Sequence, residues 1–321
     1  MCSEKHLEIR GSFKLDDHWV WCGSPVQEGD KIHLYASVWS KQYPMFAGYL
    51  WRSRIVRAEA DAESKKFVLC EDVFPEQGGK LQMAHNPAVR YFNGRWYMYF
   101  IAAPERDVFA VDDPKITDEL YHTISIYMAV ADSPAGPWVR RTEPILKAVP
   151  GLWDSSIVTN PAPCIMPDGR VHLYYRSNTP DGLRIGLAVA ENPEAEYIRY
   201  QNGPVMTDFN VEDPFVWHDG NVFRMVAKDM TGDITGEYHA GAGFVSNDGI
   251  NWQYCRKSYS KTVVSEDGTL VTFGSLERPQ VLFAENGVPE YLFAAVADGP
   301  GGFNKAKNTW NISLEIKNKS L

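Results

Sequence analysis

Short apolar runs alternate with compact polar turns along the chain, and this alternation repeats five times. Each repeat opens with a residue pair, a proline and an alternating apolar stretch. The five segments are CGSPVQ around Pro25, MAHNPAVRYF around Pro87, IVTNPAPCIM around Pro161, VEDPFVWH around Pro214 and LERPQVLF around Pro279. The prolines lie about 63 residues apart on average, so five units account for nearly the whole chain. A period of two predicts half-buried strands.

A turn and a second apolar run follow each proline segment. These runs are GDKIHLYASVW, NGRWYMYFIAA, DGRVHLYYRSN, DGNVFRMVAKD and NGVPEYLFAAVAD. Asn-Gly and Asp-Gly between alternating runs are strong hairpin signals, so each unit is predicted to contain an antiparallel hairpin. Four units add a third run. The only helical candidate is short, around residues 113–120, and lies inside an insertion at 103–123.

These repeats predict an all-β fold, a five-bladed β-propeller whose antiparallel blades surround a central channel. We expect a single domain over residues 1–321, because five units of about 63 residues account for nearly the whole length. A doubly wound α/β fold is disfavoured, because it would need helices between the strands. The tail TWNISLEIK or the amino-terminal HLEIR segment is expected to complete the terminal blade. The approximate blade boundaries are 13–70, 80–145, 150–200, 205–260 and 265–317.

Composition and charge narrow the classes of partner. The formal net charge is −9, with 41 acidic and 32 basic residues and no basic run, which argues against a nucleic-acid partner. No stretch approaches the ~20 apolar residues that span a bilayer, so no membrane partner is expected. The five cysteines are scattered, and the polar amino terminus lacks the apolar core of a secretory signal. We therefore expect a cytoplasmic protein. The oligomeric state stays open, as monomer or homo-oligomer.

The propeller geometry gathers polar residues at one place. In an antiparallel blade the start of the first strand and the end of the second lie on the same side, so repetition brings five such places together at one channel mouth. The residues expected there are His85, Asn86, Asn160, Glu212, Asp213, Glu277 and Arg278 before the prolines, and Trp39, Arg176, Lys228 and Asp229 at the ends of second strands. Such a set is typical of a polar-ligand site. Blade one is out of register with the other blades, and aligning it by its turn makes Asp17 a mouth residue.

At this point the chain resembles the five-bladed propeller glycosidases, namely glycoside hydrolase family 43 and its relatives in families 32, 68 and 117. The resemblance covers roughly residues 13–300 and rests on the blade period, the NGRWYMYF second strand and the ADSPAGPW turn. In the family-43 pattern a blade-one Asp is the general base, a blade-three Asp tunes pKa, and a blade-four Glu two positions before Pro is the general acid. Only the last transfers cleanly, to Glu212 in VEDPF.

The chain departs from that pattern at two acids. Blade three has Asn160 in place of Asp, and blade one has Ser24 at the first alignment. The segment VWCGSPVQ is also similar to the family-68 nucleophile segment, with Cys22 and Gly23 where its Asp would be. The replacement carboxylates are Asp17, Asp154, Asp213 and Glu277. We expect Glu212 as acid and Asp17 as base or nucleophile, with Glu277 as the main rival.

The resemblance implies a glycoside hydrolase that acts on an oligo- or polysaccharide with two carboxylates. Because the insertion at 103–123 is expected to overhang the mouth, we favour exo action. The expected sugar-binding residues are His85, Asn86, Asn160, Asp154, Asp213, Lys228, Asp229, Arg278, Arg176 and Trp39. No cofactor is expected, although some relatives imply a structural calcium ion, here near His85.

Two alternatives stay open. The segment Glu212-Asp213-Pro214 resembles the Glu-Asp-Pro-Arg of family-130 glycoside phosphorylases, with Phe215 in place of Arg. The other alternative is an inactive propeller that only binds carbohydrate. Release of a sugar 1-phosphate would distinguish the first of these, and binding without turnover the second.

Overall fold

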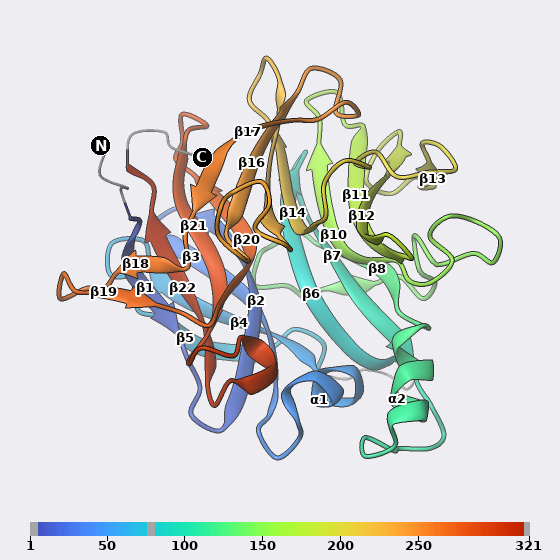
Figure 1. Cartoon of the computed structure of the whole chain (residues 1–321), viewed down its shortest axis with the longest axis horizontal. Coiled ribbons are helices and arrows are strands. Elements are labelled where there is room, and N and C mark those ends of the chain that lie inside the picture. Colours follow the sequence, from blue (N-terminus) through green and yellow to red (C-terminus); the bar gives the residue numbers. More distant parts are fainter. Residues whose placement is uncertain (1–5, 76–80, 318–321) are drawn as a thin grey trace.

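The computed structural model describes residues 6–75 and 81–317, and it contains five antiparallel sheets arranged as the predicted five-bladed propeller (Figure 1). The first strands of the blades contact one another around a closed ring, with the last blade returning to the first. Blade one comprises β2 (His18–Glu28), β3 (Lys31–Ser40), β4 (Arg54–Asp61) and β5 (Val68–Asp72). Blade two comprises β6 (Leu81–Phe92), β7 (Arg95–Pro104), β8 (Ser125–Ala131) and β9 (Val139–Arg140). Blade three comprises β10 (Thr159–Ile165), β11 (Val171–Thr179), β12 (Gly182–Ala190) and β13 (Ile198–Arg199). Blade four comprises β14 (Val211–His218), β15 (Phe223–Asp229), β16 (Gly241–Ser246) and β17 (Gln253–Tyr259).

The fifth blade joins the two ends of the chain. Its strands are β1 (Glu8–Phe13), β18 (Thr262–Val264), β19 (Leu270–Thr272), β20 (Ser275–Phe283), β21 (Pro289–Ala297) and β22 (Thr309–Glu315). β1 pairs antiparallel with β22, with Glu8 opposite Glu315. The amino-terminal HLEIR segment and the TWNISLEIK tail, which the sequence gave as alternatives, therefore both contribute strands to the fifth blade. This blade combines residues 8–13 with the chain from residue 262 onward.

Two short helices lie beside each other at one end of the sheets (Figure 1). α2 (Pro114–Tyr121) forms at the predicted helical candidate, and Asp113 caps it by accepting hydrogen bonds from two backbone N–H groups. α1 (Met45–Arg52) lies where the sequence predicted no helix. It begins after Pro44 and buries Met45 and Trp51 on one face. A 3-10 turn, η1 (Phe303–Lys305), contacts α1. No described helix is long and apolar enough to cross a membrane.

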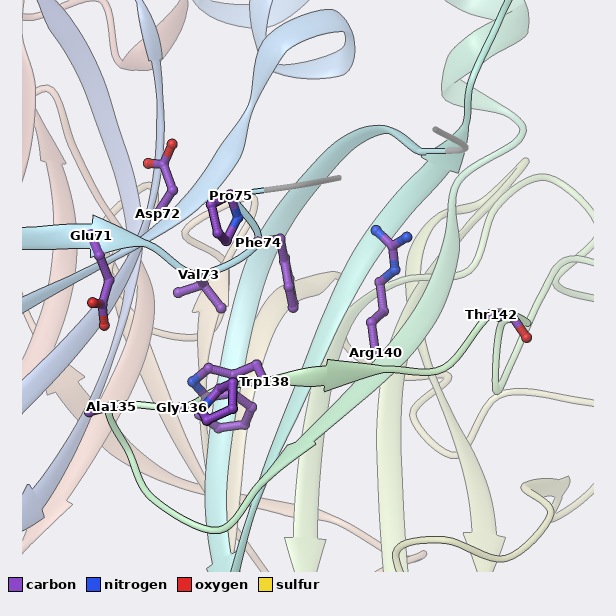
Figure 2. Close-up of a pocket in the computed structure, with 11 residues that line it drawn as sticks. Glu71, Asp72, Val73, Phe74, Pro75, Ala135, Gly136, Trp138, Arg140 and Thr142 are labelled. Atoms are coloured by element: carbon purple, nitrogen blue, oxygen red, sulfur yellow. The ribbon is translucent and has the colours of Figure 1, made fainter. Parts of the chain in front are cut away.

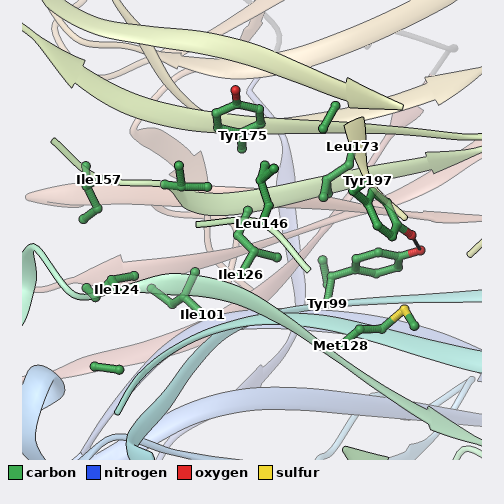
Figure 3. Packing of buried hydrophobic residues seen from close by; sticks show 14 of the residues in the cluster. Tyr99, Ile101, Ile124, Ile126, Met128, Leu146, Ile157, Leu173, Tyr175 and Tyr197 are labelled. Atoms are coloured by element: carbon green, nitrogen blue, oxygen red, sulfur yellow. Dashed lines mark hydrogen bonds between the residues drawn. The ribbon is translucent and has the colours of Figure 1, made fainter. Parts of the chain in front are cut away.

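Aromatic and aliphatic side chains fill the space between neighbouring blades. Figure 3 shows this packing between blades two and three, where Tyr99, Met128, Leu173 and Tyr175 are buried. The hydroxyl groups of Tyr99 and Tyr197 are 2.8 Å apart and hydrogen-bond to each other, which satisfies polar atoms that burial would otherwise penalise. Part of the aromatic content therefore belongs to the core.

Each first strand carries a β-bulge. The residue directly after the last paired position before the bulge has a left-handed backbone. These residues are Cys22, Asn86, Asn160, Asp213 and Arg278, with φ from 51° to 57°, and the strand register shifts beside each of them. A positive φ is uncommon outside glycine and is kept where surrounding structure enforces it. The bulges therefore mark the equivalent position in every blade.

The bulges correct the alignment of blade one. Trp21, Cys22 and Gly23 correspond to the residue pair and proline of the other blades, so neither Ser24 nor Asp17 holds the equivalent position. Gly23 replaces proline for a physical reason, because its N–H donates to Asn311 Oδ1 at 2.9 Å and proline has no N–H. A Cβ at Gly23 would also lie 2.7 Å from that oxygen.

Candidate active site

A cavity of about 110 Å³ lies where the first strands of all five blades meet. Its polar lining residues are His85, Asn86, Thr159, Asn160, Arg176, Glu212, Asp213, Glu277 and Arg278. Its apolar and aromatic lining residues are Trp21, Trp39, Met45, Phe46, Tyr49, Ile101, Tyr121 and Phe303. The structure thus brings together most of the side chains that the sequence placed at the channel mouth.

Two carboxylates of the cavity share one ammonium group. Lys228 Nζ lies 2.9 Å from Glu212 Oε2 and 2.6 Å from Glu277 Oε2. Those two oxygens are therefore at most about 5.5 Å apart, which is closer than the roughly 6.5–9.5 Å that separates the two carboxyl groups of an inverting glycosidase. Lys228 is itself only 2% exposed. Burial lowers its pKa, but the surrounding carboxylates outweigh burial and raise the pKa well above the ordinary value.

Glu212 is held as an ion. Its Oε1 lies 3.0 Å from Arg176 Nη2, so each of its oxygens faces a cation. Burial raises the pKa of Glu212, but the charges of Lys228 and Arg176 outweigh burial and lower the pKa to about 2. The sequence made Glu212 the proton donor, whereas this environment suits an ionised carboxylate.

The pKa of Asp213 is shifted in the opposite direction. It lies beside Glu212 at the channel axis, and its Oδ1 accepts a hydrogen bond from Asn160 Nδ2 at 2.6 Å. Burial and the neighbouring charge of Glu212 raise the pKa of Asp213 to about 6. When this adjacent pair takes up a proton, Asp213 therefore takes it first and Glu212 stays ionised.

Amide groups link the bulge residues of neighbouring blades. Asn86 Nδ2 donates to Asn160 Oδ1 at 2.7 Å, and Asn160 Nδ2 donates onward to Asp213. An aspartate in place of Asn160 could accept from Asn86 but could not donate to Asp213 when ionised. The departure from the family-43 pattern at this position thus has a structural consequence, since the amide here fixes the orientation of Asp213.

His85 lies among aromatic rings. Its Nδ1 is 2.8 Å from Ser53 Oγ. Its ring stacks on the ring of Tyr49, with centres 4.6 Å apart, and packs edge-to-face with the ring of Trp39, with centres 5.5 Å apart. Burial, with the charge of Arg278, lowers the pKa of His85 to about 3, so the imidazole is neutral. Nε2 is the nitrogen left to contact a ligand.

These surroundings do not fit a calcium ion at His85, because calcium takes six to eight oxygen ligands. Over residues 6–75 and 81–317, no group of three or more His, Cys, Asp and Glu is arranged to hold a metal.

Asp17 does not line the cavity. Its side chain is 87% exposed and pairs with His18 at 2.7 Å. The sequence placed it at the mouth by aligning blade one on its turn, but the bulge puts Trp21 at the equivalent position instead. At this position blade one therefore contributes the indole ring of Trp21 to the cavity in place of a carboxylate.

Two further predicted ligand-binding acids have structural partners. Asp154 is fully buried and accepts hydrogen bonds from Arg199 Nε and Tyr175 Oη, each at 2.8 Å. Asp229 accepts from backbone N–H groups between Thr231 and Thr235, and so it organises the loop after β15. Neither residue lines the cavity.

Replacing Asp154 by Asn tests this assignment. The amide keeps the size of the side chain but loses the charge that Arg199 faces, so we expect unfolding in urea to show a loss of about 1–3 kcal/mol. The turnover of the folded enzyme should stay at the wild-type value. A loss of turnover with unchanged stability would instead place Asp154 in the site.

Sequence reasoning missed several aromatic residues of the cavity. Tyr49 comes from the unpredicted helix α1, Tyr121 from the end of α2 and Phe303 from η1. Trp21 was hidden by the misaligned first blade. Reading Gly23 as a substitute for proline would have found Trp21, whereas the loop residues have no repeated pattern to reveal them.

A wider groove of about 750 Å³ lies between the last strands of blades one and two (Figure 2). Phe74, Trp138 and Arg140 line it, together with two acids. Glu71 is paired with Arg57 at 2.7 Å, and Asp72 with Arg54 at 3.1 Å. The side chains of both acids are exposed at the surface, whereas Asp213 and Glu277 of the axial cavity are buried around a shared lysine.

Solved structures share the fold of this chain. A family 117 glycoside hydrolase from the marine bacterium Zobellia galactanivorans superposes with a TM-score of 0.70 at 16% identity, covering 99% of this chain and 90% of that one. The fold is that of the five-bladed propeller glycosidases. A thermostable family-43 glycoside hydrolase gives a TM-score of 0.61 at 14% identity, covering 92% of this chain and 89% of that one.

A family-43 β-xylosidase/α-arabinofuranosidase from a compost microbial metagenome, solved with xylotriose, gives a TM-score of 0.58 at 14% identity, covering 99% of this chain and 96% of that one. No family model matches the chain, and no curated protein matches it in sequence.

Proposed function

We propose that the protein is a retaining glycoside hydrolase in which Glu212 is the nucleophile and Glu277 the general acid and base. The observation that carries this proposal is the pair of carboxylates held around Lys228 in a cavity lined by aromatic rings. Aromatic faces and a few convergent polar groups suit a sugar ring. The fold-level likeness to glycosidases supports the coarser part of the proposal, that the protein is a glycosidase.

The two carboxylates have different surroundings, which supports different roles. Glu212 faces two cations and stays ionised, as a nucleophile must. Glu277 is 4% exposed, and its Oε1 has no hydrogen-bond partner within the described residues. That buried oxygen has no competing partner among the described residues, which supports a role in passing a proton to the glycosidic oxygen and in taking one from water when a sugar fills the cavity.

The reaction then follows two displacements. Glu212 attacks the anomeric carbon while the glycosidic C–O bond breaks, and the proton of Glu277 goes to the leaving oxygen. A water molecule next attacks the anomeric carbon, gives its proton to Glu277 and releases Glu212. The free sugar keeps the configuration of the substrate. The small cavity supports exo action, since it has room for little more than the terminal sugar.

Phosphorolysis is less well supported. Arg176 and Lys228 are already paired with Glu212, so phosphate would have to displace that carboxylate from its cations. Phe215, which stands where the phosphorylase pattern has Arg, is buried against Arg90 and does not line the cavity.

The test is an assay of xylo-, arabino-, galacto- and gluco-oligosaccharides with and without inorganic phosphate. We expect phosphate-independent release of a free sugar, and NMR of the first product should show the anomeric configuration of the substrate. A sugar 1-phosphate would establish a phosphorylase. Binding in calorimetry without turnover across the panel would indicate a carbohydrate-binding protein.

A further inference from the structure

A second hollow adjoins the catalytic cavity. It has a volume of about 370 Å³ and lies between α1 and α2. Phe46 and Tyr121 line both spaces, so the two lie side by side. The catalytic cavity alone is far smaller than the roughly 300 to 1,000 Å³ of most ligand pockets, and the hollow brings the combined space into that range.

Phe46 stands at the border between the two spaces. It is 44% exposed, so much of the ring is open to a ligand. The ring of Phe46 packs against the rings of Tyr49 and Tyr121, with ring centres 5.5 Å and 6.1 Å apart, and these contacts hold it in place. An exposed ring with a fixed orientation is a suitable platform for the apolar face of a sugar.

The helices that form the hollow are clamped together. Trp51 Nε1 on α1 donates to Thr117 Oγ1 on α2 at 3.1 Å, and both residues are buried. The guanidinium of Arg52 also lies 4.0 Å from the ring centre of Phe109, in the insertion that carries α2. The hollow is therefore preorganised, which lowers the entropy cost of binding.

A polar connection leads from the hollow to the nucleophile. Arg176 Nη1 donates to Tyr121 Oη at 3.2 Å, while Nη2 of the same guanidinium pairs with Glu212. A sugar that orders Tyr121 would therefore also order the cation beside Glu212.

Acids lie at the rim of the hollow. Asp112 and Asp118 are exposed and line it, and among the described residues no Lys or Arg does so. Their carboxylates can accept hydrogen bonds from sugar hydroxyls, and they would repel a sugar that carries a carboxylate of its own.

We propose that this hollow, here called the helical subsite, binds the sugar on the leaving-group side of the scissile bond and selects an uncharged sugar there. The proposal rests on the proposed function, because it takes the cavity beside Glu212 as the place of cleavage. It implies a substrate of at least two sugars, with the terminal one in the catalytic cavity and the next one stacked on Phe46.

The kinetic test compares two substrates that share one terminal sugar. One is the disaccharide that responds in the panel, and the other is the matching glycosyl fluoride, whose leaving group is too small to reach the helical subsite. Phe46→Ala should lower kcat/KM about tenfold more for the disaccharide than for the fluoride. Phe46→Trp should retain most of the preference for the disaccharide. Tyr91→Ala removes another exposed ring, distant from the site, and serves as the control.

Equal losses on both substrates would overturn the helical subsite and leave the hydrolase intact. If wild-type protein cleaves nothing, calorimetry with the same mono- and disaccharides still decides the question. A disaccharide preference that Phe46→Ala abolishes would support the subsite, and the absence of such a preference would refute it. Disaccharides with a uronic acid in the second position should bind more tightly to Asp112→Asn/Asp118→Asn than to wild type.

Discussion

Glu212→Ala is expected to lower turnover at least about a thousandfold, because it removes the carboxylate that attacks the anomeric carbon in the proposed mechanism. Glu277→Ala should cause a comparable loss with natural oligosaccharides, whose leaving oxygen needs a proton. With a glycosyl fluoride the first step needs little acid assistance, so this variant should still form the covalent intermediate and then stall. Steady-state kinetics on both substrate types separates the two roles.

Added azide distinguishes the roles by stereochemistry. In Glu212→Ala, azide would replace the nucleophile and displace the leaving group once, which inverts the anomeric configuration. In Glu277→Ala, azide would replace water in the second displacement, so the configuration is retained. Glu71→Gln, in the outer groove, should leave turnover unchanged. Retention in both variants, or wild-type turnover in Glu212→Ala, would remove Glu212 as nucleophile.

The propeller was predictable because each blade repeats the same local pattern of strand, Gly turn and strand. The repeated strand and turn pattern determines the architecture, so a departure in one blade, such as Gly23 in place of proline, does not change the predicted fold. α1 was missed because its eight residues contain Gly48 and five aromatic or bulky apolar side chains rather than a clear polar face. Tertiary contacts with Trp39 and Tyr43 favour the helix, and these are invisible in a local pattern.

The site was predictable only where position in the blade determines direction. Asn160, Asp213 and Arg278 converge because their bulges have the same backbone conformation. Asp17 and Asp154 failed as cavity residues for a different reason, since their surroundings depend on individual partners. Asp17 pairs with His18 at the surface, and Asp154 pairs with Arg199 in the interior. The protonation roles were also unpredictable, because Lys228 and Arg176 reverse the effect that burial alone has on the pKa of Glu212.

Lys228→Met is expected to destabilise the fold by about 3–5 kcal/mol at neutral pH, because it leaves buried carboxylates without their shared cation. Lys228 Nζ contacts Glu212 and Glu277 and lies 3.7 Å from Asp213 Oδ2. Methionine keeps much of the volume of the side chain, so the loss would reflect charge. Urea unfolding at several pH values measures it.

The pH dependence of Lys228→Met identifies the cause. Lys228 lowers the pKa of both Glu212 and Asp213, so its removal raises both values in the folded protein and leaves them ordinary in the unfolded chain. The folded variant then binds more protons than the unfolded one, and its stability must fall as the pH rises. The deficit should therefore be larger at pH 8 than at pH 5. Adding Glu277→Gln to Lys228→Met should recover part of the loss, because it removes one of the uncompensated charges. A deficit that is independent of pH, and unchanged in the double variant, would show that Lys228 acts through packing rather than through its charge.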